Sequence, residues 1–392
     1  MESIFWVSLF IIFYTFIGYG IFLFMIVKLK QVFGNKRVVD YPERDQLPTC
    51  TLVVAAYNEE LFIEEKLKNT LQLNYPSGKL KFVFITDGST DRTTNIVRMY
   101  PQVQLLHQST RAGKIAAVHR AIKYVDTEIV VFTDANTYLN ADAIINICRH
   151  YCDSKVGAVA GEKRVQMNQN ADASAAGEGF YWKYESALKK WDSELNSVVG
   201  AAGELFSVRR SLYEDVPNDT VLDDFMISMR IAAKGYRIVY EPAAYAIETA
   251  SENVSEELKR KIRIAAGGIQ SILRLKSLFN PFKYPVLSFQ YISHRVLRWT
   301  ITPILLILVF LLNIVLATRP GGNFYVAILV SQIMFFLLAI TGTILEKRQI
   351  RIKALFIPYY FCVMNYAVLM GIVRYFTTKQ SAVWEKAQRK GL

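Results

Sequence analysis

Three apolar runs, each ending abruptly in small, polar or acidic residues, constrain the fold of this chain more than any other feature. The first run, TLVV, leads into Ala56-Tyr57-Asn58-Glu59, the second, FVFIT, ends at Asp87, and the third, IVVFT, ends at Asp134. Short apolar runs that stop at such residues are typical of buried strands in a doubly wound α/β sheet. Ligands of such sheets bind at the carboxyl ends of the strands, so these residues are expected to share one polar pocket.

An almost uncharged stretch from Ile4 to Val27 predicts a membrane anchor. Its 24 residues can cross a hydrocarbon core at about 1.5 Å per residue. No basic segment precedes it and no small-residue cleavage site follows it, so we interpret it as a retained anchor rather than a signal peptide. Three more apolar stretches lie near residues 299–317, 324–345 and 354–376. The chain therefore combines a domain of globular size with membrane-spanning helices.

The net charge of +12 is concentrated beside these apolar stretches. Residues 374–392, for example, carry five bases and one acid. Bases in such positions are expected to face the cytoplasm and anionic lipid, which makes nucleic acid a poor candidate partner. The bases that follow Val27, against a lone Glu2 before the anchor, place the large domain in the cytoplasm.

The same charge rule conflicts with three full crossings after the large domain, because the basic tail would then lie outside the cell. Either one late segment is re-entrant or interfacial, or the tail does not follow the charge bias. The segment 354–376 contains Pro358 and Asn365, so we expect this segment to be the broken one, with the tail in the cytoplasm.

The four cysteines, Cys50, Cys148, Cys152 and Cys362, are compatible with a reducing compartment. The spacing of Cys148 and Cys152 could begin a metal site, but no histidine or second cysteine pair accompanies them. We therefore interpret them as buried small hydrophobic residues.

Two acidic motifs predict chemistry. Asp134-Ala135-Asn136 offers one carboxylate and one amide oxygen, which are ligands that Mg²⁺ and Mn²⁺ accept. Asp223 and Asp224 are adjacent, and paired carboxylates raise each other's proton affinity, which suits a general base near neutral pH. Two acids before an amphipathic run also suit the start of a helix, and an Asp-x-Asn motif by itself is a weak signal.

In order and spacing, these motifs resemble the GT-A domain of the family 2 glycosyltransferases, especially the membrane-integrated branch related to poly-N-acetylglucosamine, hyaluronan and cellulose synthases. Asp87-Gly88-Ser89-Thr90-Asp91, Arg111-Ala112-Gly113-Lys114 and the small-residue segment Gly200–Phe206 add to the resemblance. It predicts a Rossmann-like α/β GT-A domain with α-helical transmembrane segments. The implied divisions are an N-terminal transmembrane anchor (1–30), the GT-A domain (48–257), an amphipathic interfacial collar (258–298), C-terminal transmembrane helices (299–376) and a basic tail (377–392).

The resemblance also implies a role for each motif. Asp224 would be the catalytic base, with Asp223 beside it, while Asp134 and Asn136 would hold Mg²⁺ or Mn²⁺. The residues implied to bind the nucleotide sugar donor are Tyr57, Asn58, Glu59, Asp87, Lys114 and Asp134, and those implied to bind the acceptor are Gly203, Glu204, Arg260 and Arg263.

Ile264 is the most consequential departure from the family pattern, because polymerising members have a tryptophan there. The missing indole normally offers a stacking surface to the acceptor sugar, so processive polymerisation is in doubt. Trp299 or Trp384 could supply such a ring from elsewhere. The other departures are Thr86 and Asn136 in place of Asp, Asp223 in place of Glu and Arg260 in place of Gln.

The sequence therefore predicts a membrane-bound, metal-dependent, inverting glycosyltransferase. The resemblance implies transfer from a UDP-hexose or UDP-N-acetylhexosamine to a polysaccharide or lipid-linked acceptor in cell-envelope glycan synthesis. It also implies a multi-pass protein of the inner membrane with a cytoplasmic catalytic domain. The alternative is an inactive nucleotide-fold scaffold or transporter subunit, against which Asp87, Asp134 and Asp224 argue.

Overall fold

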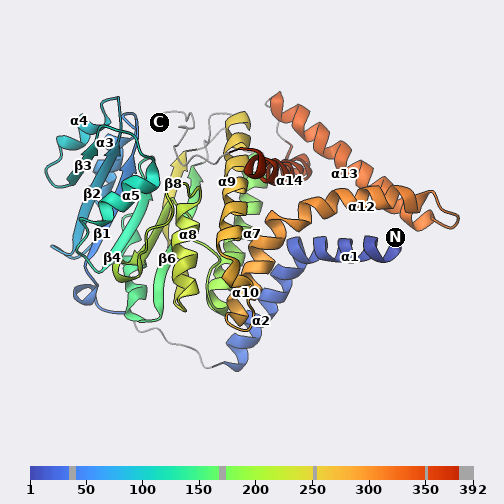
Figure 1. The fold of residues 1–392 in the computed structure, drawn as a ribbon, viewed down its shortest axis with the longest axis horizontal. Coiled ribbons are helices and arrows are strands. Elements are labelled where there is room, and N and C mark those ends of the chain that lie inside the picture. The colour runs from blue at the N-terminus through green and yellow to red at the C-terminus, as the bar shows by residue number, and fades with distance from the viewer. Residues whose placement is uncertain (35–40, 167–173, 250–253, 349–351, 379–392) are drawn as a thin grey trace.

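The computed structural model describes residues 1–34, 41–166, 174–249, 254–348 and 352–378. Figure 1 shows an α/β domain at one end of the molecule and long helices at the other, with the N-terminus at the far end of the helices. The predicted fold class, a Rossmann-like α/β domain joined to helices that could span a membrane, is thereby confirmed. Most of the predicted basic tail, with Trp384, lies outside the described residues.

One eight-stranded sheet forms the core of the α/β domain, in the order β3-β2-β1-β4-β7-β6-β8-β5. The first four strands in this order pair in parallel, whereas β7 is antiparallel to both of its neighbours. Strands that are covered on both faces read as continuous apolar runs, which is how β1 and β4 appear in the sequence. The strands are β1 (Cys50–Ala56), β2 (Leu80–Asp87), β3 (Gln104–Gln108), β4 (Ile129–Asp134), β5 (Thr137–Leu139), β6 (Val156–Gln166), β7 (Leu205–Arg209) and β8 (Arg237–Thr249).

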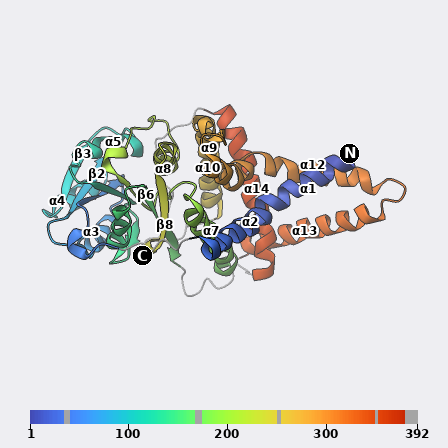
Figure 2. The same cartoon turned by 90° about the horizontal axis from the view of Figure 1, so that it is seen from below.

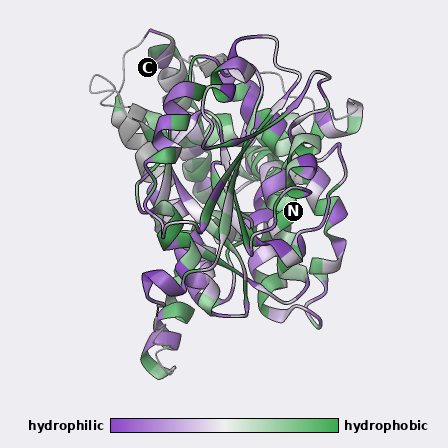
Figure 3. Cartoon of the chain, turned by 90° about the vertical axis from the view of Figure 1, so that its left-hand side faces the viewer, coloured by the Kyte–Doolittle hydropathy of each residue, from purple (hydrophilic) through white to green (hydrophobic). Residues whose placement is uncertain are grey.

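Helices cover both faces of the sheet, and alternate residues of one strand show which helix packs on which face. Leu52 and Val54 of β1 join the apolar cluster of α3, α4 and α6, whereas Val53 joins the cluster of α5 and α8. Figure 3 shows hydrophobic and hydrophilic residues mixed along these helices, as expected for amphipathic elements. Their bounds are α3 (Ile63–Leu71), α4 (Thr93–Arg98), α5 (Lys114–Ile122), α6 (Ala143–Cys148) and α8 (Asp223–Ala233).

The cysteine prediction holds only in part. Cys148 is buried as predicted, but Cys152 is exposed. Cys152 ends a 3₁₀ turn (Arg149–Cys152) that follows α6, so it no longer shares the buried face of that helix.

The long helices that join the sheet domain to the apolar helices meet at a buried ionic cluster. Asp192 of α7 accepts a hydrogen bond from the Tyr19 hydroxyl (2.5 Å) and contacts His294 Nδ1 at 2.6 Å. Glu185, about two turns earlier on α7, pairs with Arg295 and Arg298, each at 2.9 Å. His294, which is fully buried, holds a structural position in this cluster. The helices involved are α2 (Tyr19–Phe33), α7 (Ser174–Leu195), α9 (Val254–Arg274), α10 (Pro285–Tyr291), a π-helical turn (Ile292–Val296) and α11 (Leu297–Trp299).

Three helices are long and apolar enough to cross a membrane, and a bent pair adds a possible fourth span among the described residues. The N-terminal helix runs without a break from α1 through a π-helical turn (Tyr14–Gly18) into α2, in agreement with the predicted anchor. The remaining apolar helices are α1 (Glu2–Phe13), α12 (Ile301–Ala317), α13 (Asn323–Lys347) and α14 (Lys353–Thr377).

The prediction that the last apolar segment is the broken one is wrong. α14 is one continuous helix through Pro358 and Asn365, and the break instead separates α11 from α12 with a bend of 54° at Thr300. Pro303 favours a break at this position, because in a continuous helix its ring would meet the carbonyl of Trp299 four residues earlier. Pro358 has the same relation to Ala354, yet α14 stays continuous there, so a proline does not by itself decide where an apolar segment breaks.

α14 differs from the other apolar helices in direction. Figure 1 shows α14 end-on while α1, α12 and α13 extend along the long axis, and Figure 2 shows α14 running across the molecule. It packs mainly on α9, and a Cβ at Gly371 would lie 2.5 Å from the Cβ of Ala265. The glycine therefore allows the two helix backbones to approach closely.

Candidate active site

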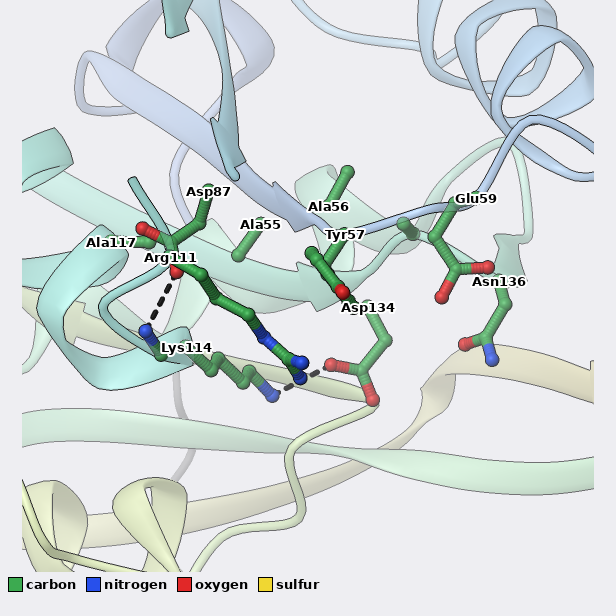
Figure 4. A pocket seen from close by; sticks show the side chains of 12 residues that line it. Ala55, Ala56, Tyr57, Glu59, Asp87, Arg111, Lys114, Ala117, Asp134 and Asn136 are labelled. Carbon is green, nitrogen blue, oxygen red and sulfur yellow. Dashed lines mark hydrogen bonds and ion pairs between the residues drawn. The ribbon is translucent and has the colours of Figure 1, made fainter. Parts of the chain in front are cut away.

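The three predicted strand ends meet at one edge of the sheet. β1 pairs in parallel with both β2 and β4, which sets Ala56 opposite Thr86 and Ala55 opposite Asp134. A hollow of about 450 Å³ opens beyond these strand ends (Figure 4). It is lined by Ala55, Ala56, Tyr57, Glu59, Asp87, Arg111, Gly113, Lys114, Ala117, Asp134, Ala135 and Asn136.

Of the predicted donor residues, Asn58 is the one that does not line this hollow. Its backbone has a φ of 53°, and its side-chain oxygen accepts a hydrogen bond from the Thr90 amide at 2.8 Å. The amide of Asn58 donates to Ser89 Oγ at 3.1 Å. Asn58 therefore ties the loop after β1 to the loop after β2, and a donor contact remains a prediction.

Asp87 fixes the turn that leads into α5. Its Oδ2 accepts hydrogen bonds from the backbone amides of Ala112 (2.9 Å) and Gly113 (2.7 Å). Its Oδ1 accepts hydrogen bonds from both terminal nitrogens of Arg120, each at 3.1 Å. Both carboxylate oxygens are thus engaged within the protein. Asp87 places the neighbouring Lys114, whereas its predicted direct contact with the donor remains untested. No sequence pattern indicated Arg120, which lies in the last turn of an ordinary amphipathic helix.

Arg111 is a pocket residue whose role the sequence reasoning missed. Its guanidinium lies 3.7 Å from the centroid of the Tyr57 ring, and Figure 4 shows its side chain extending toward Asp134. Its Nη2 is buried and has no hydrogen-bond partner in the part of the chain that the structure describes. A planar guanidinium can donate two parallel hydrogen bonds to a phosphate. In the sequence, the signal for Arg111 is its position just before the Gly113-Lys114 turn.

Lys114 lines the hollow and also lies near the acidic pair Asp223 and Asp224. Its Nζ donates to Asp134 Oδ1 at 2.7 Å (Figure 4). Burial lowers the pKa of the Lys114 ammonium, but the carboxylates of Asp134, Asp223 and Asp224 outweigh burial and raise it above its ordinary value. Lys114 therefore stays charged and faces three carboxylates at once.

Lys66 of α3, which no sequence pattern indicated, supports the Asp134-Ala135-Asn136 turn. Lys66 is fully buried, and its Nζ donates to Thr133 Oγ1 (3.1 Å) and to the Thr137 carbonyl (2.7 Å). Burial lowers the pKa of Lys66 to about 7, against the opposing effect of Asp134. Because Thr133 and Thr137 flank the turn, these bonds fix its backbone.

The residues present fit a hard divalent cation. Asp134 and Asn136 line the same hollow and offer a carboxylate and an amide oxygen. The described residues contain no group of three or more His, Cys, Asp or Glu side chains that could hold a metal by themselves. A cation bound here would therefore need further oxygens from a ligand such as a diphosphate.

Asp224 stands in the first turn of α8, next to Asp223. Neither carboxylate caps the helix, because the residue at the N-cap position is Leu222 and no side chain caps it. Burial and then the neighbouring Asp223 raise the pKa of Asp224 to about 7, in spite of the nearby Lys114 ammonium. A carboxylate with this proton affinity is suited to general-base catalysis near neutral pH.

Gly203 separates Asp224 from Lys114. A Cβ at this glycine would lie 3.4 Å from Asp224 Oδ2 and 3.6 Å from Lys114 Nζ. The predicted small-residue segment therefore passes directly beside the candidate base, and it leaves room there for a substrate group.

A second ionic cluster lies near Asp224, because the carboxylate of Glu204 is close enough to raise the pKa of Asp224. Glu204 pairs with Lys163 of β6 at 2.5 Å and with Arg260 of α9 at 3.4 Å, and Glu248 of β8 pairs with both bases. Burial raises the pKa of Glu204, but Lys163 and Arg260 outweigh it and hold the pKa well below its usual range. The predicted acceptor residues Glu204 and Arg260 are thus brought together, whereas Arg263 lies one turn further along α9.

Comparison with known proteins agrees with this geometry. Residues 51–216 match the family model "Glycosyl transferase family 2". Over 239 residues the chain is 28% identical to the poly-beta-1,6-N-acetyl-D-glucosamine synthase of Staphylococcus aureus (strain COL), a match that covers 59% of this chain and 57% of the relative. The synthase of the same name from Staphylococcus epidermidis is 25% identical over 247 residues, covering 61% and 59%. The chain thus spans less than two thirds of the length of these relatives.

A solved structure extends the likeness over nearly the whole chain. The mannosyltransferase PcManGT from Pyrobaculum calidifontis, solved in complex with GDP-Man and Mn²⁺, superposes with a TM-score of 0.69 at 23% identity, covering 95% of this chain and 99% of the other. The predicted GT-A fold with appended helices is thereby confirmed.

The raised pKa of Asp224 predicts a pH-dependent stability difference between the protein and its Asp224→Asn variant. The pKa is about 7 in the folded protein, against an ordinary value of 3.8, so ionisation of Asp224 opposes folding once the pH exceeds about 4. We expect Asp224→Asn to become increasingly more stable than the wild type as the pH rises from about 4 to about 7, by at most about 4 kcal/mol.

Thermal unfolding of the purified protein in detergent, measured across this pH range, tests the expectation. Asp223→Asn removes the like charge and should shrink the difference. A stability difference that does not change with pH would mean that Asp224 titrates as an ordinary surface carboxylate.

Proposed function

We propose that this chain, whose residues 51–216 form a family 2 glycosyltransferase domain, transfers a sugar from a nucleotide sugar to an acceptor hydroxyl at the membrane surface. The observation that carries the proposal is the juxtaposition of two sites. A partly buried carboxylate of raised pKa, Asp224, lies across Gly203 from an ammonium, Lys114, which also pairs with Asp134. A base for the acceptor and a cationic group for the leaving diphosphate are what sugar transfer requires.

In this proposal the hollow at the strand ends receives the donor. The nucleoside lies near Tyr57 and Glu59, and the diphosphate lies toward Lys114 and Arg111, which both line the hollow. These two cationic groups stabilise the negative charge that develops on the leaving diphosphate. The donor sugar then points toward Gly203, where the backbone leaves room for it.

Asp224 acts on the acceptor. Its carboxylate takes the proton of the acceptor hydroxyl as the oxygen forms a bond to the anomeric carbon of the donor sugar, while the bond from that carbon to the diphosphate breaks. The nucleoside diphosphate leaves with the bonding electron pair. No covalent enzyme intermediate is needed, so the configuration at the anomeric carbon inverts.

Asp134 and Asn136 would hold the Mg²⁺ or Mn²⁺ that the family implies. Such a cation neutralises the phosphate charge and orients the leaving group. The Mn²⁺ in the P. calidifontis structure supports this choice of ion class. Lys66 contributes by fixing the backbone of the turn that carries both residues.

We propose a UDP-hexose or UDP-N-acetylhexosamine as donor and a polysaccharide or lipid-linked glycan as acceptor, in cell-envelope glycan synthesis. The N-acetylglucosamine in the printed name of the staphylococcal relatives supports the donor class. Ile264 is 36% exposed on α9 and offers no aromatic platform, which favours short additions over processive polymerisation.

We also propose a topology in which the catalytic domain and the tail share the cytoplasmic side of the inner membrane. α1, α12 and α13 extend along one axis away from the sheet domain, and α12 and α13 form an antiparallel pair (Figure 1). α14 runs across this axis on the surface of α9, so it lies along the membrane instead of crossing it (Figure 2). Three crossings then place the basic tail on the same side as the catalytic domain, which satisfies the charge rule.

Loss of the base tests the proposed function. Asp224→Asn should lower transfer by at least about a hundredfold while it leaves donor affinity within a few-fold, because the lost group acts on the acceptor. To measure transfer, purified protein is incubated with a panel of UDP-hexoses, UDP-N-acetylhexosamines and GDP-mannose, and the products are identified by mass spectrometry. Near-normal turnover by the folded variant would remove Asp224 from the mechanism, and the absence of both transfer and donor hydrolysis by the wild type would favour the scaffold alternative.

The cation site predicts that excess chelator abolishes transfer and that Mg²⁺ or Mn²⁺ restores it. Asn136→Asp adds a carboxylate, so it should lower the cation concentration needed for half-maximal rate or leave it unchanged. Binding of Mn²⁺ to the protein with UDP, followed by electron paramagnetic resonance, gives a readout independent of turnover. Undiminished activity in excess chelator would show that Asp134 and Asn136 serve another purpose.

The topology predicts which positions a membrane-impermeant thiol reagent reaches in intact cells. In a background without native cysteines, Arg319→Cys, in the loop between α12 and α13, should be labelled from outside. Thr378→Cys, after α14, should be protected, as should the control Asp126→Cys in the α/β domain. Labelling of Thr378→Cys from outside would show that α14 crosses the membrane.

A further inference from the structure

The break between α11 and α12 brings a membrane-proximal tryptophan to the catalytic helix. The bend of 54° at Thr300 ends α11 at Trp299, and α11 packs on α9. The indole of Trp299 lies against the Phe225 ring, with ring centroids 5.5 Å apart. Phe225 directly follows Asp224 in the first turn of α8.

Three glycines leave the space that this contact and the residues before α8 occupy. A Cβ at Gly268 would lie 2.6 Å from Trp299 Cε3, and a Cβ at Gly200 would lie 2.1 Å from Phe225 Cδ2. The neighbouring Gly267 admits Val221 at the start of α8, since a Cβ there would lie 2.8 Å from Val221 Cγ1. The Gly267-Gly268 pair of α9 thus accommodates both the start of the catalytic helix and the indole that holds it.

Phe225 is consequently held from two sides. Gly200, whose φ is +85°, presents bare backbone on one side, and Trp299 closes the other. Trp299 is itself fixed by the Arg295 guanidinium, 5.5 Å from its ring, and Arg295 pairs with the buried Glu185. The chain of contacts therefore runs from the ionic cluster at the membrane end to the residue next to Asp224.

We propose that Trp299 is a positioning residue, which acts through Phe225 to hold Asp224 toward the acceptor. The inference rests on the proposed function of Asp224 and extends it to the membrane segment. We assign Trp299 to positioning the base instead of stacking on the acceptor, because its partly buried ring already contacts Phe225 and lies close against Gly268. A bend in a membrane segment thereby sets the geometry of the catalytic carboxylate.

The expected fall in kcat follows from the small displacement of a catalytic group that a reaction tolerates. A misplacement of about 1 Å can lower the rate about a hundredfold. Trp299→Ala leaves a space beside Phe225, so the first turn of α8 can shift, and kcat should fall by roughly 10- to 100-fold. Trp299→Phe keeps a ring in place and should retain more activity. The affinity for UDP should change less than about threefold, since Trp299 does not line the donor hollow.

Gly268→Ala tests the same contact from the other side without changing the tryptophan. The added methyl group must displace the indole, so this variant should reproduce the fall in kcat with unchanged UDP affinity. Trp191→Phe is the matched control, because Trp191 of α7 packs on Phe24 with ring centroids 5.2 Å apart, far from α8. It should leave kcat within about twofold.

A second readout needs no activity. The groups that face Asp224 are Asp223, Lys114 and Glu204, and Trp299→Ala changes none of them. Water that reaches the loosened carboxylate should nevertheless lower its folded-state pKa, so the stability advantage of Asp224→Asn over its parent should be smaller and should level off at a lower pH in the Trp299→Ala background. This double-variant comparison remains informative even if the wild type transfers no sugar, in which case the proposed function fails separately.

Three results would overturn the proposal. Unchanged kcat of Trp299→Ala and Gly268→Ala, with only a lower thermal midpoint, would show a purely structural role. A raised KM for the acceptor at unchanged kcat would assign Trp299 to acceptor binding. An unaltered pH dependence of the Asp224→Asn stability difference in the Trp299→Ala background would show that the two residues are not coupled.

Discussion

The ion pair between Lys114 and Asp134 is the interaction on which the rest of the site depends. One ammonium, 2.7 Å from Asp134, also faces Asp223 and Asp224, so it is the common counter-charge of three acidic groups. Desolvation of several carboxylates in one place is costly, and it is tolerated only where a cation compensates. The pair therefore allows the proposed cation-binding carboxylate and the proposed base to share one counter-charge.

The surrounding structure holds this ammonium in place. Asp87 fixes the turn before Lys114 through two backbone amides, and Arg120 fixes Asp87. Gly203 leaves the space between Lys114 and Asp224 open. On the far side of Asp224, the contact of Phe225 with Trp299 extends the same arrangement to the membrane helices. The donor pocket, the base and the membrane segment are thus linked by short, specific contacts.

Local sequence signals predicted the parts of this site that depend on strand ends. β1, β2 and β4 end where the apolar runs stop, and parallel pairing then brings Tyr57, Asp87 and Asp134 together. The signals could not identify residues whose partners are distant in the chain. Lys66 in α3 reads as a solvated helix residue, yet it is buried under the Asp134 turn. The position of the helix break could not be predicted from prolines alone, because α14 continues through Pro358 whereas the chain bends at Thr300, three residues before Pro303.

A structure of the protein with UDP and Mn²⁺ would test the central role of Lys114 most directly. An ammonium that neutralises Asp134 in the protein alone can instead neutralise a diphosphate once a cation occupies the carboxylate. The account predicts that Lys114 Nζ turns from Asp134 to the diphosphate oxygens, within hydrogen-bond distance, while Asp134 and Asn136 bind the cation. A diphosphate bound away from Lys114, with the Lys114–Asp134 pair intact, would contradict it.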